Sequence, residues 1–539
     1  MKSFIYKALL IGSLMILQVC SFSLKKKSSG EFEPDWQSLR QFETPEWFRD
    51  AKFGIYFHWG VYSVPAYKTE WYSRRMYEPG SQVHRYHVTN YGPVQEFGYK
   101  DFIPMFRGEQ FNAEEWAQLF RKAGARFAGP VAEHADGFAM WDSKLTRFDA
   151  TEMGPMIDVV GEMERAVRAE GMKFITTFHH QWLFGWYPTW DKSSGTAEPA
   201  YRDLYGPVVP PTAWKPAGEN PDPLPDDKFC RRWLSRVEEV IDLYHPDLVY
   251  FDSKMHIIDE KTRLKMLSHY YNHALKLGKE VLVTYKQEDL KPWAGVLDLE
   301  RSRMEKKKEF PWLTDDSVDW GSWCHVSEPS YKSANRIIDY LVDVVSKNGC
   351  VLLNVTPTAS GVIPEPVRDR LLEIGRWLEI NGEAIYSTRP WEVCGEGPSE
   401  IIEGHLNERE NPDMTISDIR FTCNGEYLYA IILEPPYTTR ITIASMNPEN
   451  GITPETIEQV DMLGSVQPVG WETGEEGTVL IWDRDPELEH ALAFRIRLKS
   501  KSGRKKTNHQ HNSTRPEGSE DAIDPDRISH RFSAISYPQ

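Results

Sequence analysis

Six titratable residues each follow a short apolar or aromatic run. They are His58, His134, His179, His180, Asp252 and Glu300. Asp252 comes directly after Leu-Val-Tyr-Phe, and Glu300 comes after Val-Leu-Asp-Leu. A carboxylate at the mouth of an apolar sheet is costly unless it is paired or takes part in a reaction. Two carboxylates on nearby strand ends would suit glycoside cleavage, in which one attacks the anomeric carbon and the other protonates the leaving oxygen.

Structural roles for the same carboxylates remain open. Asp252 can be the ion-pair partner of a nearby cation, for which the candidates are Lys254, Lys286 and Arg301. Two nearby glutamates, Glu305 and Glu309, are alternative candidates for the role of Glu300. Lysines can also bind sulfate or carboxylate groups on a sugar, or be solvated, and the candidates are Lys68, Lys254 and Lys286.

The stretch 52–77 combines polar and aromatic residues in a pattern that suits a sugar site. His58 ends an apolar run, and Glu70-Trp71-Tyr72 follows soon after it. Charged groups can hold sugar hydroxyls while an indole covers the apolar face of the ring. The alternative is an ordinary packed core with one satisfied histidine.

A histidine-bound metal is a further alternative, because His179 and His180 could join His58 and His134. No HxH or HExxH spacing joins these four histidines, so we expect no metal and no cofactor.

The elements that must position these residues alternate between apolar runs and amphipathic helices over residues 45–390. Strands are expected at 53–57, 127–132, 173–178, 248–251, 280–284, 295–299 and 351–355. Helices are expected at about 112–123, 157–170, 260–277, 333–346 and 365–380. A further helix is expected to carry Trp233 and Tyr244 on one face and to stop at His245-Pro246. Residues 193–226 contain eight prolines, which predicts a long surface loop.

Strand–helix alternation on this scale predicts an α/β fold, a (β/α)8-like barrel over residues 35–390. The carboxyl ends of such strands build the active site, which is where the six titratable residues fall. Short runs between 391 and 499 predict a C-terminal antiparallel β-sandwich, and residues 500–539 a disordered polar tail.

Composition limits the partners and the cellular location. The formal charge of −17 argues against nucleic acid or anionic membrane as a main partner. Residues 1–23 have a basic start and a short apolar stretch, which predicts a signal peptide, no membrane span, and secretion or a periplasmic location. Cys20 loosely fits a bacterial lipoprotein site, so a lipid anchor in an outer membrane is an alternative.

Several motifs resemble those of the α-L-fucosidases of glycoside hydrolase family 29. They are FGIYFHWGVYSVPAY, EWYSRRMY, EHADGFAMWDSKLTRFD, DVVGEM, DLVYFD, and LLNVTPTASGVIP followed by LLEIGRWLEINGEAIY. The resemblance covers about residues 45–395. It implies a retaining, metal-free enzyme that releases terminal α-linked L-fucose from glycans through a covalent fucosyl-enzyme intermediate.

The resemblance also implies roles for individual residues. It makes Asp252 the nucleophile. It implies a set of sugar ligands, namely His58, Glu70, Trp71, His134, Tyr250 and at least one of His179 and His180. The acid/base segment varies within the family. Leu313 follows Trp312 where some members carry a glutamate, so we predict Glu300 as the acid/base.

A second departure concerns Ala135, which follows His134 where the family usually has a second histidine. Loss of one hydrogen bond to a sugar hydroxyl would cost roughly 1.5–3 kcal/mol at a charged contact, unless a group such as His180 compensates. Two other functions therefore stay open: a catalytically silent glycan-binding protein, and a barrel glycosidase for a related sugar such as a galactoside.

Overall fold

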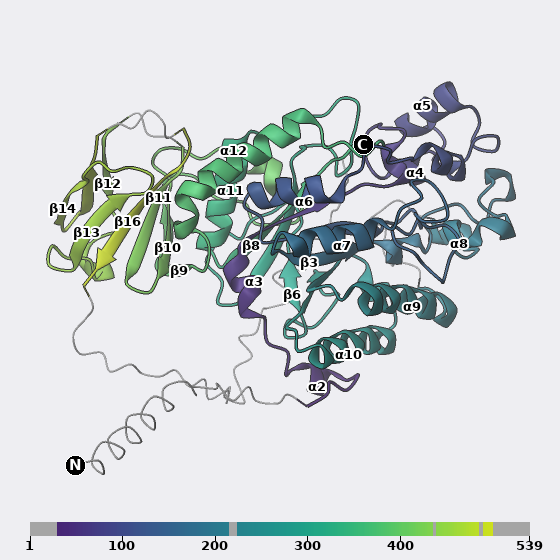
Figure 1. Cartoon of the computed structure of the whole chain (residues 1–539), viewed down its shortest axis with the longest axis horizontal. Helices are drawn as coiled ribbons and strands as arrows, with labels where there is room; N and C mark the ends of the chain where they lie inside the picture. Colours follow the sequence, from purple (N-terminus) through teal and green to yellow (C-terminus); the bar gives the residue numbers. More distant parts are fainter. Residues whose placement is uncertain (1–29, 215–223, 435–437, 484–488, 500–539) are drawn as a thin grey trace, which may run out of the picture.

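The computed structural model describes residues 30–214, 224–434, 438–483 and 489–499 (Figure 1). Its central element is a closed barrel of eight parallel strands, in which β1 pairs with both β2 and β8. The strands are β1 (Phe53–Phe57), β2 (Phe127–Glu133), β3 (Lys173–Phe178), β4 (Leu248–Phe251), β5 (Leu282–Lys286), β6 (Val296–Asp298), β7 (Trp312–Ser317) and β8 (Gly349–Val355). The predicted α/β barrel is thereby confirmed.

The barrel strands are buried on both faces, which explains their nearly continuous apolar runs. Alternate side chains point in opposite directions. One set, which includes Tyr56, Tyr250 and Leu313, fills the barrel interior. The other set, which includes Phe57 and Val249, packs against the surrounding helices. The polar strand ends are therefore held on a rigid, fully packed base.

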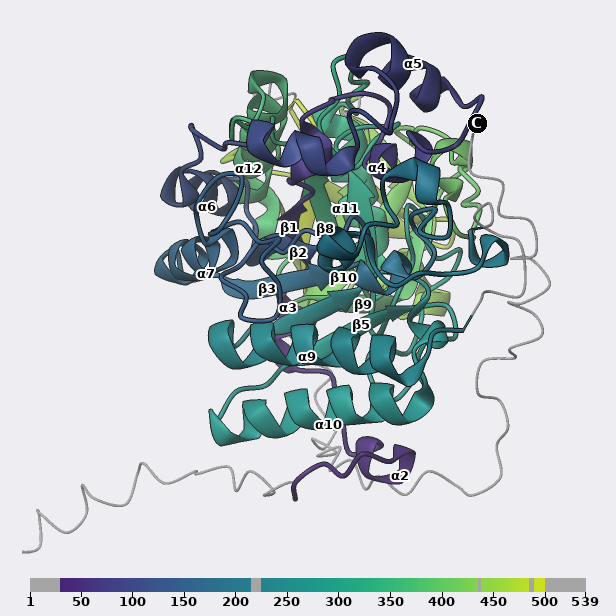
Figure 2. The same cartoon turned by 90° about the vertical axis from the view of Figure 1, so that its right-hand side faces the viewer.

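Helices cover the outside of the barrel. Those that connect or follow the barrel strands are α6 (Ala113–Lys122), α7 (Val159–Ala169), α9 (Asp227–Tyr244), α10 (Glu260–Lys276), α11 (Ala334–Ser346) and α12 (Glu365–Asn381). The others are α2 (Trp36–Leu39), α3 (Glu46–Ala51), α4 (Tyr72–Arg75), α5 (Gln82–Tyr91) and α8 (Arg202–Tyr205). Figure 2 shows α9 and α10 lying side by side in this outer layer.

Two antiparallel sheets follow the barrel, as predicted. The larger has the order β13 (Ile457–Met462), β16 (Leu492–Leu498), β11 (Tyr427–Ile432), β10 (Ile419–Asn424) and β9 (Arg389–Glu396). The smaller has the order β12 (Arg440–Ile443), β15 (Gly477–Ile481) and β14 (Gly470–Gly474). Apolar side chains from both sheets, such as Phe421 and Leu480, form one buried cluster.

The structure corrects several predicted boundaries. Strand β7 was not predicted, because its sequence Trp-Leu-Thr-Asp-Asp-Ser is too polar to read as a buried strand. Strand β5 begins and ends two residues later than predicted, so that it ends at Lys286. Strand β6 ends at Asp298, which places Glu300 in the following turn. Part of the predicted long loop forms helical turns and α8, with Leu204 and Tyr205 buried.

The predicted signal peptide, the anchor at Cys20 and the polar tail all lie outside the described residues. Within the parts that are described, no helix has the length and apolar character that crossing a membrane requires.

Candidate active site

Four of the predicted site residues come directly after neighbouring barrel strands. His58 follows β1, His134 follows β2, His179 follows β3 and Asp252 follows β4. Because the strands are parallel and consecutive around the barrel, these residues meet at one mouth.

Lys286 is the centre of a buried group of carboxylates at this mouth. Its Nζ lies 2.7 Å from Glu300 Oε2, 3.4 Å from Asp252 Oδ1, 3.4 Å from Asp315 Oδ1 and 3.5 Å from Asp298 Oδ2. The lysine side chain is 2% exposed, whereas those of Asp252 and Glu300 are 19% and 12% exposed. The two predicted catalytic carboxylates therefore meet across one lysine and are the members of the group most open to solvent.

The shared lysine also limits how far apart these two carboxylates lie. The contacting oxygens of Asp252 and Glu300 can be separated by no more than the sum of 3.4 Å and 2.7 Å. That limit is below the roughly 6.5–9.5 Å of inverting glycosidases and accommodates the roughly 5–5.5 Å of retaining enzymes. The geometry suits a retaining mechanism.

The charges in this group shift one another's pKa values. Burial raises the pKa of Asp252 to about 7, although Lys286 opposes the rise. Burial also disfavours ionisation of Glu300, but Lys286 and His405 outweigh it and lower the pKa of Glu300 to about 2. Burial acts to lower the pKa of Lys286, yet the surrounding carboxylates prevail and raise it well above its usual value. Two carboxylates on one ammonium titrate as a pair, and this pair holds one proton between about pH 2 and about pH 7.

A cluster of three histidines forms the other side of the mouth. The rings of His58, His134 and His179 lie 4.8–5.5 Å apart, centre to centre. Burial lowers the pKa of His58 to about 4 and the pKa values of His134 and His179 well below the usual value, so all three are neutral at pH 7. His58 Nδ1 donates to Asn354 Oδ1 at 2.8 Å. Among the residues described, His134 Nδ1 and His179 Nδ1 have no hydrogen-bond partner, which leaves them available to a ligand.

The same three imidazoles are a possible metal-binding set, since one nitrogen from each lies within 4.8 Å of the others. Neutral imidazole nitrogens can bind either a metal ion or sugar hydroxyls. The second choice agrees with the apolar and aromatic surroundings, in which Trp323 and Trp186 pack against the histidine rings.

His180 faces away from the histidine cluster, and Tyr250 lies at its base, with its ring centre 6.1 Å from that of His179. His180 stacks on Trp233 of α9, and its Nε2 lies 3.3 Å from the Trp233 carbonyl oxygen. It therefore faces the helix layer, so His179 rather than His180 is the neighbour of His134. Tyr250 is in the barrel interior, where its hydroxyl donates to Asp315 Oδ2 at 3.1 Å. Tyr250 therefore contacts Asp315, one of the buried carboxylates around Lys286.

Glu70 and Trp71 border the histidine cluster through aromatic neighbours. Glu70 is buried, and its Oε2 accepts a hydrogen bond from the backbone N–H of Trp323 at 3.2 Å. Burial raises the pKa of Glu70. Trp71 is partly buried against Trp182 and Trp186, with ring centres at 5.3 Å and 4.7 Å. This side of the mouth is lined with indoles, as a sugar ring requires.

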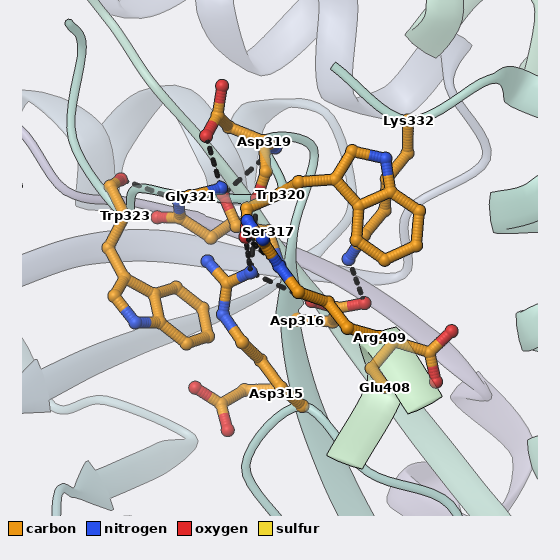
Figure 3. A network of polar contacts seen from close by, with 12 residues as sticks. Asp315, Asp316, Ser317, Asp319, Trp320, Gly321, Trp323, Lys332, Glu408 and Arg409 are labelled. Carbon is orange, nitrogen blue, oxygen red and sulfur yellow. Dashed lines mark hydrogen bonds and ion pairs between the residues drawn. The ribbon is translucent and has the colours of Figure 1, made fainter. Parts of the chain in front are cut away.

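The loop that follows β7, drawn in Figure 3, carries Trp323, whose ring centre lies 5.6 Å from that of His58. Asp319 Oδ1 accepts the N–H groups of Gly321 and Ser322 at 2.7 Å and 2.8 Å, which folds the loop tightly. Asn354 Nδ2 donates to the Trp323 carbonyl oxygen at 2.6 Å. Asn354 thus connects the position of His58 to that of Trp323.

A segment beyond β9 also reaches the mouth. His405 Nε2 lies 3.8 Å from Glu300 Oε2, and the N–H of Leu406 donates to the Glu300 carbonyl oxygen at 3.0 Å. Glu408 holds the same segment in place through Arg303 and Arg336. The part of the chain that follows the barrel therefore supports the predicted acid/base.

Several site residues had no assigned catalytic role in the sequence. Lys286 was considered only as a cation near Asp252 or for acidic substrates, and neither Asp315 nor His405 was considered. The period of two in β7 could have revealed Asp315, because it shares the interior face with Leu313. Leu313 itself is buried in the barrel interior and has no group that can donate a proton.

A closed parallel barrel with a lysine-bridged carboxylate pair beside neutral histidines defines a glycoside hydrolase of the retaining barrel type. The family model described as Alpha-L-fucosidase matches residues 19–383. The chain belongs to the α-L-fucosidase family, as its motifs predicted.

Individual relatives agree with this assignment. The tissue α-L-fucosidase of Rattus norvegicus is 31% identical over 401 residues, which is 72% of this chain and 80% of the rat protein. The Homo sapiens tissue enzyme is 29% identical over 453 residues, 82% of this chain and 85% of the human protein. A solved structure of Thermotoga maritima α-fucosidase in complex with fucose has a TM-score of 0.68 at 28% identity, covering 86% of this chain and 100% of that one.

Proposed function

We propose that the protein is a retaining, exo-acting α-L-fucosidase that releases terminal α-linked L-fucose from glycans. Asp252 is the nucleophile and Glu300 the acid/base. The observation that carries this assignment is the position of Lys286 between the two carboxylates, 3.4 Å from one and 2.7 Å from the other. No other pair of carboxylates among the described residues at the mouth combines this contact with exposure to solvent.

The reaction takes place in two displacements. In the first, Asp252 attacks the anomeric carbon while Glu300 gives its proton to the glycosidic oxygen, which leaves as an alcohol. In the second, Glu300 takes a proton from water, and the water oxygen displaces Asp252 from the sugar. L-fucose is released with net retention, and both carboxylates return to their starting state.

The pair must carry its single proton on Glu300 for the first step. In the free enzyme Lys286 is closer to Glu300 than to Asp252, which favours the proton on Asp252. Movement of the ammonium toward Asp252 and Asp315 would reverse this preference. The first step requires this shift, because the nucleophile must be an anion and the acid a neutral carboxyl group.

The histidine cluster holds the sugar. His58, His134 and His179 present neutral imidazoles to the fucose hydroxyls, and Glu70, Trp71 and Trp323 complete that side of the pocket. His179, 4.8 Å from His134, takes the place of the partner that Ala135 does not provide.

Substitution of the nucleophile tests the proposal. Asp252→Gly is expected to lower the hydrolysis of an aryl α-L-fucoside by more than about 10³-fold, because covalent catalysis is lost. A folded variant with unchanged turnover would refute the role of Asp252. A panel of aryl glycosides checks the sugar, and preference for a galactoside over the fucoside would refute the fucosidase assignment.

We also propose that the enzyme acts outside the cytoplasm. The support is the basic and apolar pattern of residues 1–23, with a lipid anchor at Cys20 as the alternative form. Cell fractionation with mass spectrometry of the mature N-terminus distinguishes the two forms. A cytoplasmic protein with an intact N-terminus would refute both.

A further inference from the structure

A group of histidines and acidic residues lies on the outer helix layer, at the carboxyl ends of α9 and α10. Asp242 comes from α9, and His269 and His273 come from α10. One ligand atom from each of these three residues lies within 4.8 Å of the other two. Their side chains are 51%, 32% and 20% exposed, so an ion in solution can reach them.

The helices determine this arrangement. His269 and His273 are four residues apart and therefore face the same side of α10. Helix α9 packs along that side (Figure 2), which places Asp242 opposite the two rings. Asp242 Oδ1 lies 2.8 Å from His269 Nε2 and 3.2 Å from His273 Nδ1.

These distances are close to those that a metal ion requires. Nitrogen and oxygen ligands about 2.0–2.1 Å from a tetrahedral Zn²⁺ lie roughly 3.3 Å from one another. A small opening of the His269 contact would make room for the ion. Two imidazoles and one carboxylate leave a fourth position open to water on the exposed side.

Both histidines also have a partner on the second ring nitrogen. His269 Nδ1 lies 3.9 Å from Glu238 Oε1, and His273 Nε2 lies 2.8 Å from His245 Nδ1. Metal-bound histidines usually donate their other N–H to a carboxylate or a similar acceptor, which fixes the ring orientation. His245 is within hydrogen-bond distance for this role, and Glu238 is within ion-pair distance. A cation here would also relieve the repulsion between Glu238 and Asp242, which lie one turn apart on α9.

We infer that Asp242, His269 and His273 form a binding site for a divalent first-row transition metal ion such as Zn²⁺. The site joins α9 to α10. It is distinct from the catalytic mouth, because α9 ends just before β4 begins, at the opposite end of the barrel from the strand ends that carry Asp252.

Metal titration of the full-length protein tests the inference. After dialysis against a chelator, Zn²⁺ binding is measured by calorimetry and Co²⁺ binding by visible absorption, at about pH 7.5, where histidine is ordinarily neutral. We expect the double variant His269→Gln/His273→Gln to bind one Zn²⁺ fewer than the wild type and to lose an intense tetrahedral Co²⁺ band. Glu238→Gln keeps all three ligands and is expected to bind about 10–100-fold more weakly.

Matched controls separate this site from other histidines. Lys261→Ala alters an exposed position on the same helix and should bind like the wild type. Fucosidase activity and circular dichroism should be unchanged in all variants, because the site is outside the mouth. The inference is overturned if the double variant binds as many Zn²⁺ ions, with the same affinity and the same Co²⁺ spectrum, as the wild type.

Discussion

The two sides of the barrel mouth carry different chemical groups and have different roles in the proposed reaction. The ends of β1, β2 and β3 carry buried histidines, which burial keeps neutral. The ends of β4 to β7 carry one lysine among four carboxylates, in which each charge depends on its neighbours. Neutral imidazoles can hold hydroxyls without a net charge, whereas bond cleavage needs a carboxylate anion and a mobile proton.

This difference predicts which kinetic parameter a substitution on each side should change. Changes on the carboxylate side should lower kcat and shift its pH dependence, because that side stabilises charge in the transition state. Changes on the histidine side should act mainly on substrate affinity. A histidine-side variant that mainly lowers kcat, or a carboxylate-side variant that changes only substrate affinity, would show that the two sides do not have separate roles.

After Asp252→Gly, the largest effect is expected for Glu300→Ala. Loss of the general acid should lower turnover of a natural fucosylated glycan by about 10²–10⁴-fold. An aryl fucoside with a good leaving group should lose much less in the first step, because it needs little protonation. The ratio of the two losses is measured with both substrates. The exposed neighbour Glu305, changed to Gln, is the control, and equal losses for both substrates would contradict the assignment of Glu300.

Lys286→Met is expected to have the next largest effect. It should lower kcat at pH 7 by about 10²–10³-fold, because it removes a buried electrostatic contact. Without the cation, the pKa values of Asp252 and Glu300 rise, so the activity limit at high pH should move upward. Lys286→Arg keeps the charge and should leave that limit near its wild-type position. A pH–rate profile of each variant checks the sign, and a downward shift in Lys286→Met would refute the lysine's role.

The pH profile of the wild type should show a limit near pH 7. The carboxylate pair holds one proton below about pH 7 and loses it above, so the general acid is then missing. We expect kcat/KM to fall about tenfold per pH unit above this limit. Flat activity between pH 7 and pH 9 would show that the reaction does not use this proton.

The sequence predicted the residues at the strand ends better than the network of charges beneath them. His58, His134, His179 and Asp252 could be placed because each directly follows an apolar strand, and strand ends meet in a barrel. The network beneath them could not be predicted. It depends on β7, whose acidic residues conceal a buried strand, and on a loop beyond β9. Buried charges are stable only together, so their arrangement depends on contacts that no single segment encodes.

Substitutions of His179 and His180 are expected to have the smallest effects. They test directly whether only the mouth-facing histidines hold the sugar. The two residues are adjacent in the chain, but His179 faces the mouth and His180 stacks on Trp233 of α9. His179→Ala should raise KM roughly 2- to 12-fold, the equivalent of about 0.5–1.5 kcal/mol for one neutral hydrogen bond. Its unfolding free energy should fall as well, because its ring is also buried, so KM is the quantity that separates the two variants.

His180→Ala should differ in its effect on KM. It removes a buried ring and its contact with the Trp233 carbonyl oxygen, which should lower the unfolding free energy by about 1–3 kcal/mol. KM should stay near the wild-type value, since the ring does not reach the mouth. KM for an aryl fucoside and the free energy of unfolding in urea, measured for both variants, check these expectations. If His180→Ala raises KM as much as His179→Ala does, then the site extends behind β3, and the division between a holding side and a cleaving side fails there.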